Sequence, residues 1–257
     1  MIDRADKLFE RIRLLTPKDP VDLATPAEKL VALPFPSLLP TLPRDRFDLD
    51  HDNNWSYMAR EKFKELLRGV KKPLEGPDVG LWFYGTIGYG KSHMLAALVC
   101  YLLSTGSQVI YIPDCQECLG DPVEYFRAAM LLAWSRNVVL QMQIMDLETR
   151  DDISRFFKTR AAEGCRAIFV IDQMNALEPN DGVTWSTDDT KNKASLEAWL
   201  YECSTQHLTV VGLSANNTSF PRLKRSKKTY RRVNAYGGLT EVGICCIGTS
   251  DSAKMVF

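Results

Sequence analysis

The fold of this chain is decided by one stretch, Gly85-Thr86-Ile87-Gly88-Tyr89-Gly90-Lys91-Ser92, which matches the pattern G-x-x-x-x-G-K-[ST] at every fixed position. The glycines allow a bend tight enough for backbone N–H groups to surround a phosphate. The ammonium group of Lys91 can then reach the outer phosphates of a nucleotide, and the hydroxyl of Ser92 can ligate Mg²⁺. We therefore predict that these eight residues, together with His93, bind a nucleotide.

The sequence on either side of this loop favours the same function. Before the loop, Val79–Tyr84 is an apolar run typical of a buried strand, and after it, Lys91–Ser104 is a strongly helical stretch. A helix that begins at Lys91 points its partly positive N-terminus at the bound phosphates. The order of strand, loop and helix therefore agrees with the motif.

Apolar strands alternate with helical stretches along the rest of the chain. Beyond the loop, strands are predicted at 108–112, 167–171 and 208–213, and helices at 122–142, 147–162 and 193–203. Continuous apolar strands alternating with helices are typical of a parallel sheet covered on both faces. We therefore predict an α/β fold of the P-loop NTPase class, additional-strand type, for a nucleotide-binding domain at residues 55–235.

Two segments flank this predicted domain. Residues 1–54 are rich in proline and, after a helix at Ala5–Leu15, are expected to form an extended strap over a neighbouring surface or a partly disordered leader. Residues 55–69 have the pattern of an amphipathic helix. Residues 236–257 form an irregular tail, and no helical lid follows, so we expect a missing lid and a truncated or alternatively spliced product.

A second motif supplies the metal side of the site. Asp172 follows the apolar run 167–171, where a carboxylate can position Mg²⁺ directly or through water, so we predict that Ser92 and Asp172 hold the metal. The next residue, Gln173, cannot accept a proton at neutral pH, but it can orient a water molecule. Three explanations stay open. Gln173 orients water in a slow hydrolase, or the base is another residue, or the protein binds nucleotide and barely hydrolyses it.

Other polar residues are predicted to follow the neighbouring strands. Asp114 and Glu117 come after strand 108–112 and are candidates for the base, as is Glu178. Asn216 or Asn217, after strand 208–213, could sense the γ-phosphate or the attacking water, although asparagines also simply form turns there. The predicted catalytic set is therefore Lys91, Gln173, Asp114 and Asn216.

The overall composition excludes several classes of protein. The chain has 257 residues, a formal net charge of zero and seven cysteines, an odd number typical of reduced intracellular thiols. Cys115-x-x-Cys118 has no second pair, so a zinc site is not expected. The charged N-terminus does not look like a signal peptide, and no apolar run has the length of a membrane span. An intracellular protein, in cytoplasm or nucleus, is expected.

The most basic stretch of the chain is Arg222–Arg232, with seven basic residues in eleven. It can be a solvated surface helix or loop, or a nuclear-import or nucleic-acid patch. Alternatively, an arginine from it, Arg222 or Arg225, reaches the γ-phosphate in cis or from a neighbouring subunit of an oligomer.

Several segments of the chain resemble the P-loop ATPase module of Crinkler-type effectors and the related retrotransposon-hot-spot proteins. The resemblance spans roughly residues 55–240 and is carried by the phosphate loop and by three further segments: 109–115 (Val-Ile-Tyr-Ile-Pro-Asp-Cys), 171–177 (Ile-Asp-Gln-Met-Asn-Ala-Leu) and 214–217 (Ser-Ala-Asn-Asn). It implies that Gln173 is a family trait and that such modules are nucleotide-driven switches beside other domains. The Crinkler translocation module is not recognisable, so the resemblance does not imply secretion.

These observations predict an ATP-binding, Mg²⁺-dependent ATPase that acts as a nucleotide-driven switch, with protein partners. ATP is favoured because no Asn-Lys-x-Asp guanine reader is present. Three alternatives stay open: a non-catalytic nucleotide-binding interaction module, a nucleic-acid-stimulated ATPase or loader, and a small-molecule kinase with the basic run as its lid.

Overall fold

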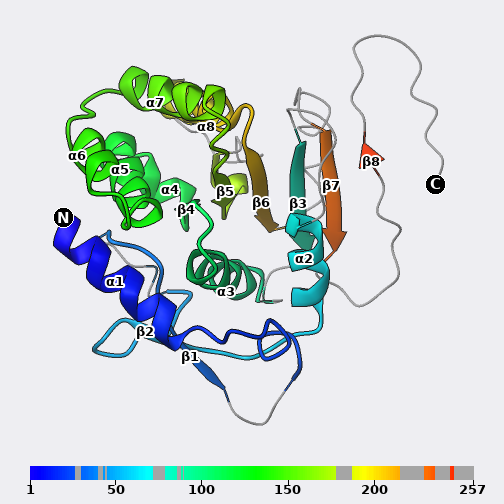
Figure 1. Cartoon of the computed structure of the whole chain (residues 1–257). Helices are drawn as coiled ribbons and strands as arrows, with labels where there is room; N and C mark the ends of the chain where they lie inside the picture. The colour runs from blue at the N-terminus through cyan, green and yellow to red at the C-terminus, as the bar shows by residue number, and fades with distance from the viewer. Residues whose placement is uncertain are drawn as a thin grey trace.

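The computed structural model describes residues 1–26, 30–39, 43, 45–71, 79–85, 88, 90–177, 187–214, 229–234 and 244–245. Its centre is a six-stranded sheet in the order β4-β5-β6-β3-β7-β8 (Figure 1). The strands are β3 (Val79–Gly85), β4 (Val109–Ile112), β5 (Ile168–Ile171), β6 (Leu208–Ser214), β7 (Thr229–Asn234) and β8 (Ile244–Cys245). The first five strands in this order pair in parallel, and β8 pairs with β7 in the antiparallel sense.

Helices cover both faces of this sheet. They are α1 (Ile2–Leu15), α2 (Lys62–Lys71), α3 (Lys91–Ser104), α4 (Cys115–Cys118), α5 (Pro122–Ala133), α6 (Val138–Met145), α7 (Arg150–Ala162), the 3₁₀-helix η1 (Met174–Leu177) and α8 (Thr187–Ser204). Leu95 of α3 lies against Gly212 of β6, whereas Phe157 of α7 packs on Phe169 of β5 with ring centroids 4.8 Å apart. Phe169 is in register with Thr209 of β6, so the two residues face the same side of the sheet. Residues 209 and 212 point to opposite faces of the strand, so α3 and α7 lie on opposite faces of the sheet. The predicted α/β architecture with a parallel sheet is therefore confirmed.

The described part of the N-terminal segment packs on α3. Helix α1 contacts α3 and α5, and an antiparallel hairpin joins β1 (Val31–Pro34) to β2 (Asn54–Tyr57) beside them (Figure 1). Phe35, Phe47 and Trp55 are at most 2% exposed and belong to the main hydrophobic core. These residues add a layer on the side of α3 away from the sheet.

The helices predicted at 5–15 and 193–203 begin earlier than predicted, at Ile2 and Thr187. Three other predicted helices differ from the observed ones because of local signals. Trp55 and Tyr57 alternate with exposed residues in strand β2, so the helix predicted from residue 55 begins only at Lys62. The side chain of Asn137 accepts a hydrogen bond from the N–H of Leu140 and starts a new helix, which divides the stretch 122–142 into α5 and α6. Thr149 and Asp152 form a capping box, which delays the next helix to Arg150.

The basic run is also different from its predicted form. Residues 229–232 belong to β7, which lies beside β3 in the parallel sheet. The predictions that these residues form a surface helix or loop, or the lid of a kinase, are therefore wrong. Residues 222–228 of the run lie outside the described ranges.

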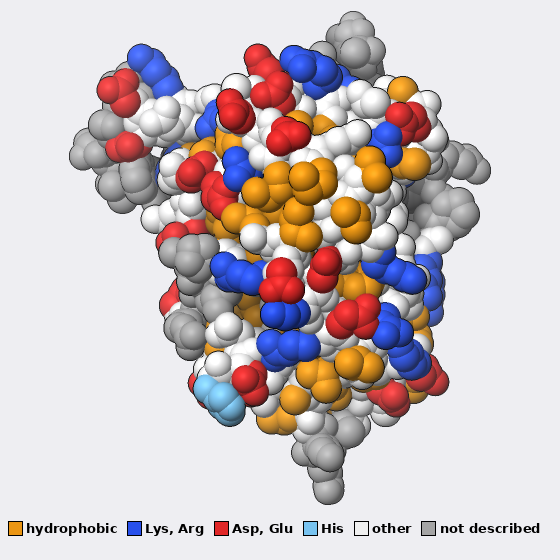
Figure 2. Space-filling model, turned by 60° about the vertical axis from the view of Figure 1, so that its left-hand side comes forward, with side chains coloured by type: hydrophobic (Ala, Val, Ile, Leu, Met, Phe, Trp, Pro, Cys, Tyr) orange, Lys and Arg blue, Asp and Glu red, His pale blue; other side chains and the backbone are white. Residues whose placement is uncertain are grey.

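Acidic and basic side chains mix with hydrophobic groups on the face that carries α1 and α6 (Figure 2). Val138, Val139 and Met142 of α6 are more than half exposed. Among the helices that the structure describes, none combines the length and the hydrophobicity needed to cross a membrane.

Candidate functional site

The five parallel strands bring their carboxyl ends to one edge of the sheet. There, β3 leads into the glycine-rich loop, Asp114 follows β4, and Asp172 follows β5. The chain leaves β3 toward β4 on one side and returns from β6 to β7 on the other side of β3. Ligands of open α/β sheets bind at such a switch point, so the predicted residues meet where a ligand site is expected.

The loop between β3 and α3 requires glycine at its last position. Gly88 and Gly90 both have positive φ values, 86° and 69°. Gly90 is the N-cap of α3, and a Cβ atom there would lie 3.1 Å from the guanidinium carbon of Arg60. Any other residue would therefore meet both backbone strain and a charged neighbour. Thr86, Ile87 and Tyr89 lie outside the described residues.

Lys91 is the first residue of α3 and is only 6% exposed. Burial lowers the pKa of its ammonium group, and the negative charge of Asp172 partly opposes this change. A buried lysine at a helix N-terminus, beside a carboxylate, has the chemistry of a phosphate-binding group.

Asp172 is the central carboxylate of the site and is 3% exposed. Burial raises its pKa, whereas a hydrogen bond from the Ser92 hydroxyl and the charges of Arg46 and Lys91 lower it. Its Oδ1 atom also accepts a hydrogen bond of 2.8 Å from the N–H of Gln173. A Cβ atom on Gly212 would lie 2.7 Å from Oδ1, so glycine in β6 makes room for this carboxylate.

Arg46 is a site residue that sequence reasoning missed. Its Nη2 atom lies 2.7 Å from Oδ2 of Asp114, and its Nη1 atom lies 3.4 Å from Oδ2 of Asp172. The partners are 68 and 126 residues away in the sequence, and Arg46 belongs to no motif. A local pattern could not have found it.

Asp114 has two structural roles besides its predicted one. It is the N-cap of α4, where Oδ1 accepts hydrogen bonds from the N–H groups of Gln116 and Glu117, and Oδ2 pairs with Arg46. Both oxygens are therefore engaged, and its role as a base stays a prediction. Glu117 lies in α4, one turn of helix beyond this cap.

Gln173 has an unusual backbone for a residue other than glycine. Its φ value is 56°, and its carbonyl accepts a hydrogen bond of 2.8 Å from the N–H of Ala176 as the chain turns into η1. Such left-handed residues cluster at functional sites, where the surrounding structure holds the strain. Its role in orienting water stays a prediction. Glu178, Asn216, Asn217, Arg222 and Arg225 lie outside the described residues.

His93, in the first turn of α3, has its ring in an aromatic cluster. The imidazole stacks on Phe47 with centroids 4.5 Å apart and meets Trp55 edge-on at 5.2 Å. Burial lowers its pKa, and the positive charges of Arg60 and Arg46 lower it further. A contact of His93 with a nucleotide stays a prediction.

Arg60→Ala and Arg46→Ala should each raise the pKa of His93 toward its ordinary value of 6.5, because each removes a cation that disfavours the imidazolium. In the folded protein the neutral ring is favoured, so its contribution to stability is present above pH 6.5 and is lost as the pH falls through the lowered pKa. NMR titration of the three histidines measures this change. His207, which contacts Ala167 and Phe157 instead, is the control. An unchanged His93 titration in both variants would contradict the arrangement.

The donors at Asp172 are oxygen atoms, which suit hard cations such as Mg²⁺. Within the described ranges, no group of three or more His, Cys, Asp and Glu side chains could hold an ion. Mg²⁺ bound with a nucleotide needs few protein ligands, because phosphate oxygens and waters complete its octahedron. A hydroxyl hydrogen-bonded to a carboxylate, as in Ser92 and Asp172, is therefore suited to Mg²⁺ that arrives with a nucleotide.

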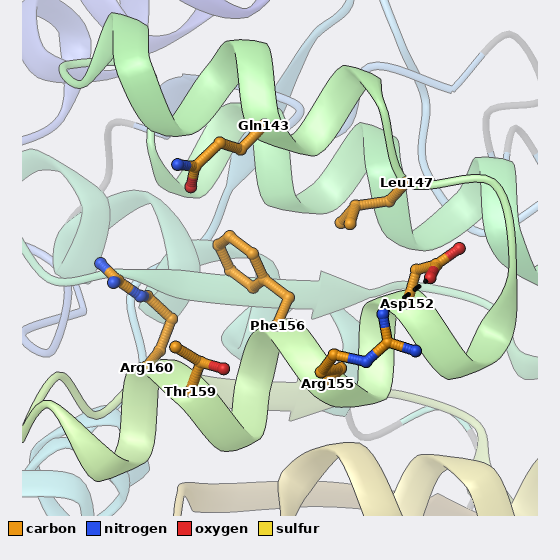
Figure 3. Close-up of a pocket in the computed structure, with 7 residues that line it drawn as sticks. All are labelled: Gln143, Leu147, Asp152, Arg155, Phe156, Thr159 and Arg160. Atoms are coloured by element: carbon orange, nitrogen blue, oxygen red, sulfur yellow. Dashed lines mark hydrogen bonds and ion pairs between the residues drawn. The ribbon is translucent and has the colours of Figure 1, made fainter.

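A separate hollow lies between α6 and α7, with a volume of about 240 Å³ (Figure 3). Phe156 points into it, and Arg155 at its rim pairs with Asp152. None of its lining residues belongs to the loop 85–92 or to the strand ends that carry Asp114 and Asp172. It is therefore no part of the candidate site.

Comparison with known proteins adds no relative: no protein-family model matches the chain, and no curated protein is similar to it.

Proposed function

We propose that this chain binds ATP with Mg²⁺ and hydrolyses it, as a P-loop ATPase of the additional-strand type. The observation that carries the proposal is that Lys91 and Ser92, the first two residues of α3, lie beside the buried carboxylate of Asp172. Three residues from two distant motifs thus meet at the end of one helix. In P-loop enzymes the lysine binds the phosphates, and the hydroxyl and the carboxylate together position Mg²⁺.

The strand order supports the same assignment. β6 lies between β3, which precedes the loop, and β5, which ends at Asp172. One additional strand in this place distinguishes additional-strand ATPases from P-loop proteins in which the two strands are neighbours. The pairing of β6 with both β3 and β5 does not depend on the loop residues or on Asp172, so it supports the proposal independently.

Each residue then has a role in the proposed reaction. Backbone N–H groups of the loop and Lys91 would hold the phosphates, while Ser92 and Asp172 would hold Mg²⁺, which neutralises charge on the phosphates when bound. Gln173, next to Asp172, would orient the attacking water. ATP as the nucleotide, the switch function and membership of the Crinkler-type group rest on the sequence.

A direct test uses the purified full chain. Binding of ATP with and without Mg²⁺ is measured by calorimetry, and phosphate release is measured without any acceptor and with or without DNA or RNA. The proposal expects Mg²⁺-dependent binding and phosphate release without an acceptor. Binding without release would favour an interaction module, and release only with an acceptor would favour a kinase.

Gln173→Ala should lower the turnover number by about 10²–10³-fold and leave the dissociation constant for ATP unchanged, because it removes a group that orients water and not one that holds phosphate. Gln206→Ala is a matched control, since Gln206 is also a glutamine with positive φ, 67°, in the turn before β6. Unchanged turnover in Gln173→Ala would move the water-orienting role to another residue.

A further inference from the structure

The guanidinium of Arg46 lies between two carboxylates of the candidate site. Besides Asp114 and Asp172, it contacts the carbonyl oxygen of Pro113, at 3.1 Å from Nη1. The side chain is 15% exposed, and its buried Nε atom makes no hydrogen bond to a described residue, although Asp45 lies 3.6 Å away. Arg46 thus faces the oxygen atoms of Asp172 and has a donor to spare.

The residue that follows Arg46 packs in the hydrophobic core. Phe47, the next residue, is 1% exposed and packs on Phe35, Trp55 and His93 with centroids 4.5–5.2 Å apart. His93 directly follows Ser92 in α3. Arg46 is therefore next to a residue that packs on the first turn of α3, the helix that follows the phosphate loop.

The charges of the site favour a change of partner when nucleotide binds. Two cations, Arg46 and Lys91, lie beside the carboxylates of Asp114 and Asp172. ATP carries more negative charge than one Mg²⁺ neutralises, and a metal ion at Asp172 would repel a guanidinium bonded to the same carboxylate. A terminal phosphate near Lys91 would then be the strongest acceptor within reach, and guanidinium binds phosphate through two parallel hydrogen bonds.

We propose that Arg46 binds the γ-phosphate of ATP, supplied in cis by the N-terminal segment, and is held by Asp114 and Asp172 when nucleotide is absent. This inference rests on the proposed function. It gives Arg46 the role that the sequence suggested for Arg222 or Arg225. Arg46 is then a catalytic residue, since it touches the group that is transferred to water.

Arg46→Ala separates this inference from the proposed function. The affinities for Mg²⁺–AMP-PNP, which keeps a γ-phosphate, and for Mg²⁺–ADP are measured by calorimetry on the full chain. Arg46→Ala should weaken AMP-PNP binding by about 10- to 100-fold and change ADP binding by less than about 3-fold. Arg11→Ala is the matched control, because Arg11 bonds to Asp52 and Asn54 within the same segment.

The outcomes differ for the two proposals. If the natural protein binds neither nucleotide, the proposed function fails. If the natural protein binds both nucleotides and Arg46→Ala keeps the full preference for AMP-PNP, the inference alone fails. The inference also fails if Arg46→Ala binds AMP-PNP more tightly, because that result would show that Arg46 competes with the metal. Should Arg46→Ala not fold, Arg46→Lys decides: a single ammonium lacks the two-armed geometry and should lower the preference for AMP-PNP several-fold, and an unchanged preference overturns the inference.

Discussion

Lys91→Ala is expected to lower the affinity for Mg²⁺–ATP by at least about 100-fold and to remove phosphate release with it. Lys91 is buried at the N-terminus of α3, so its ammonium has little competition from solvent and would interact strongly with a phosphate. Burial already lowers its pKa, and a bound phosphate would favour the charged form again. Calorimetry and the rise of the unfolding temperature with ATP both measure the loss.

The control for this substitution is Lys158→Ala. Lys158 pairs with Glu202 on the surface between α7 and α8, with 2.7 Å between Nζ and Oε1, and carries the same charge. The Lys158→Ala variant should bind ATP with the same affinity as the natural protein. Equal ATP binding by Lys91→Ala and Lys158→Ala would show that the loop does not hold a nucleotide, and the proposed function would have to be given up.

Phe47→Ala is expected to lower the free energy of unfolding by about 3–5 kcal/mol, the usual cost of removing a fully buried phenyl ring. Phe47 is 1% exposed and joins the N-terminal segment to His93 of α3. Urea unfolding measures the change. The substitution should also reduce the preference for AMP-PNP over ADP, because Arg46 loses its anchored neighbour.

Phe47→Leu separates packing from the aromatic stacking on His93. It keeps most of the buried volume, so we expect a cost clearly smaller than that of Phe47→Ala. A loss below about 1 kcal/mol for Phe47→Ala would mean that residues 43–49 do not pack on α3 as described.

The parts of the fold that depend on local sequence were predictable. The phosphate loop, the strand before it and α3 after it follow from glycine spacing and apolar periodicity, and the bounds of α3 agree with the prediction. Helix ends set by a single cap, such as Asn137 before α6, were misplaced because a capping side chain is a weak signal within a long helical pattern.

Contacts between distant residues were predictable only where both residues belong to recognised motifs. Ser92 and Asp172 belong to two motifs that are predicted to bind the same metal ion, so the motifs placed them in one site. Arg46 lies in a proline-rich stretch with no pattern around it. β7 was missed for a related reason. Its charged sequence, Thr-Tyr-Arg-Arg-Val-Asn, reads as surface, and only its pairing with β3 makes it a strand.

The position of the N-terminal segment on α3 has a consequence for folding during synthesis on the ribosome. Phe35, Phe47 and Trp55 are synthesised well before α3, on which their layer packs, and before β4 and β5, whose ends carry the acidic partners of Arg46. Domains fold as units while the chain grows from its N-terminus, so these aromatic residues stay without a surface to dock on until the central sheet exists. These aromatic residues are therefore made before the surface on which they pack, and Arg46 can pair with Asp172 only after β5 has been made.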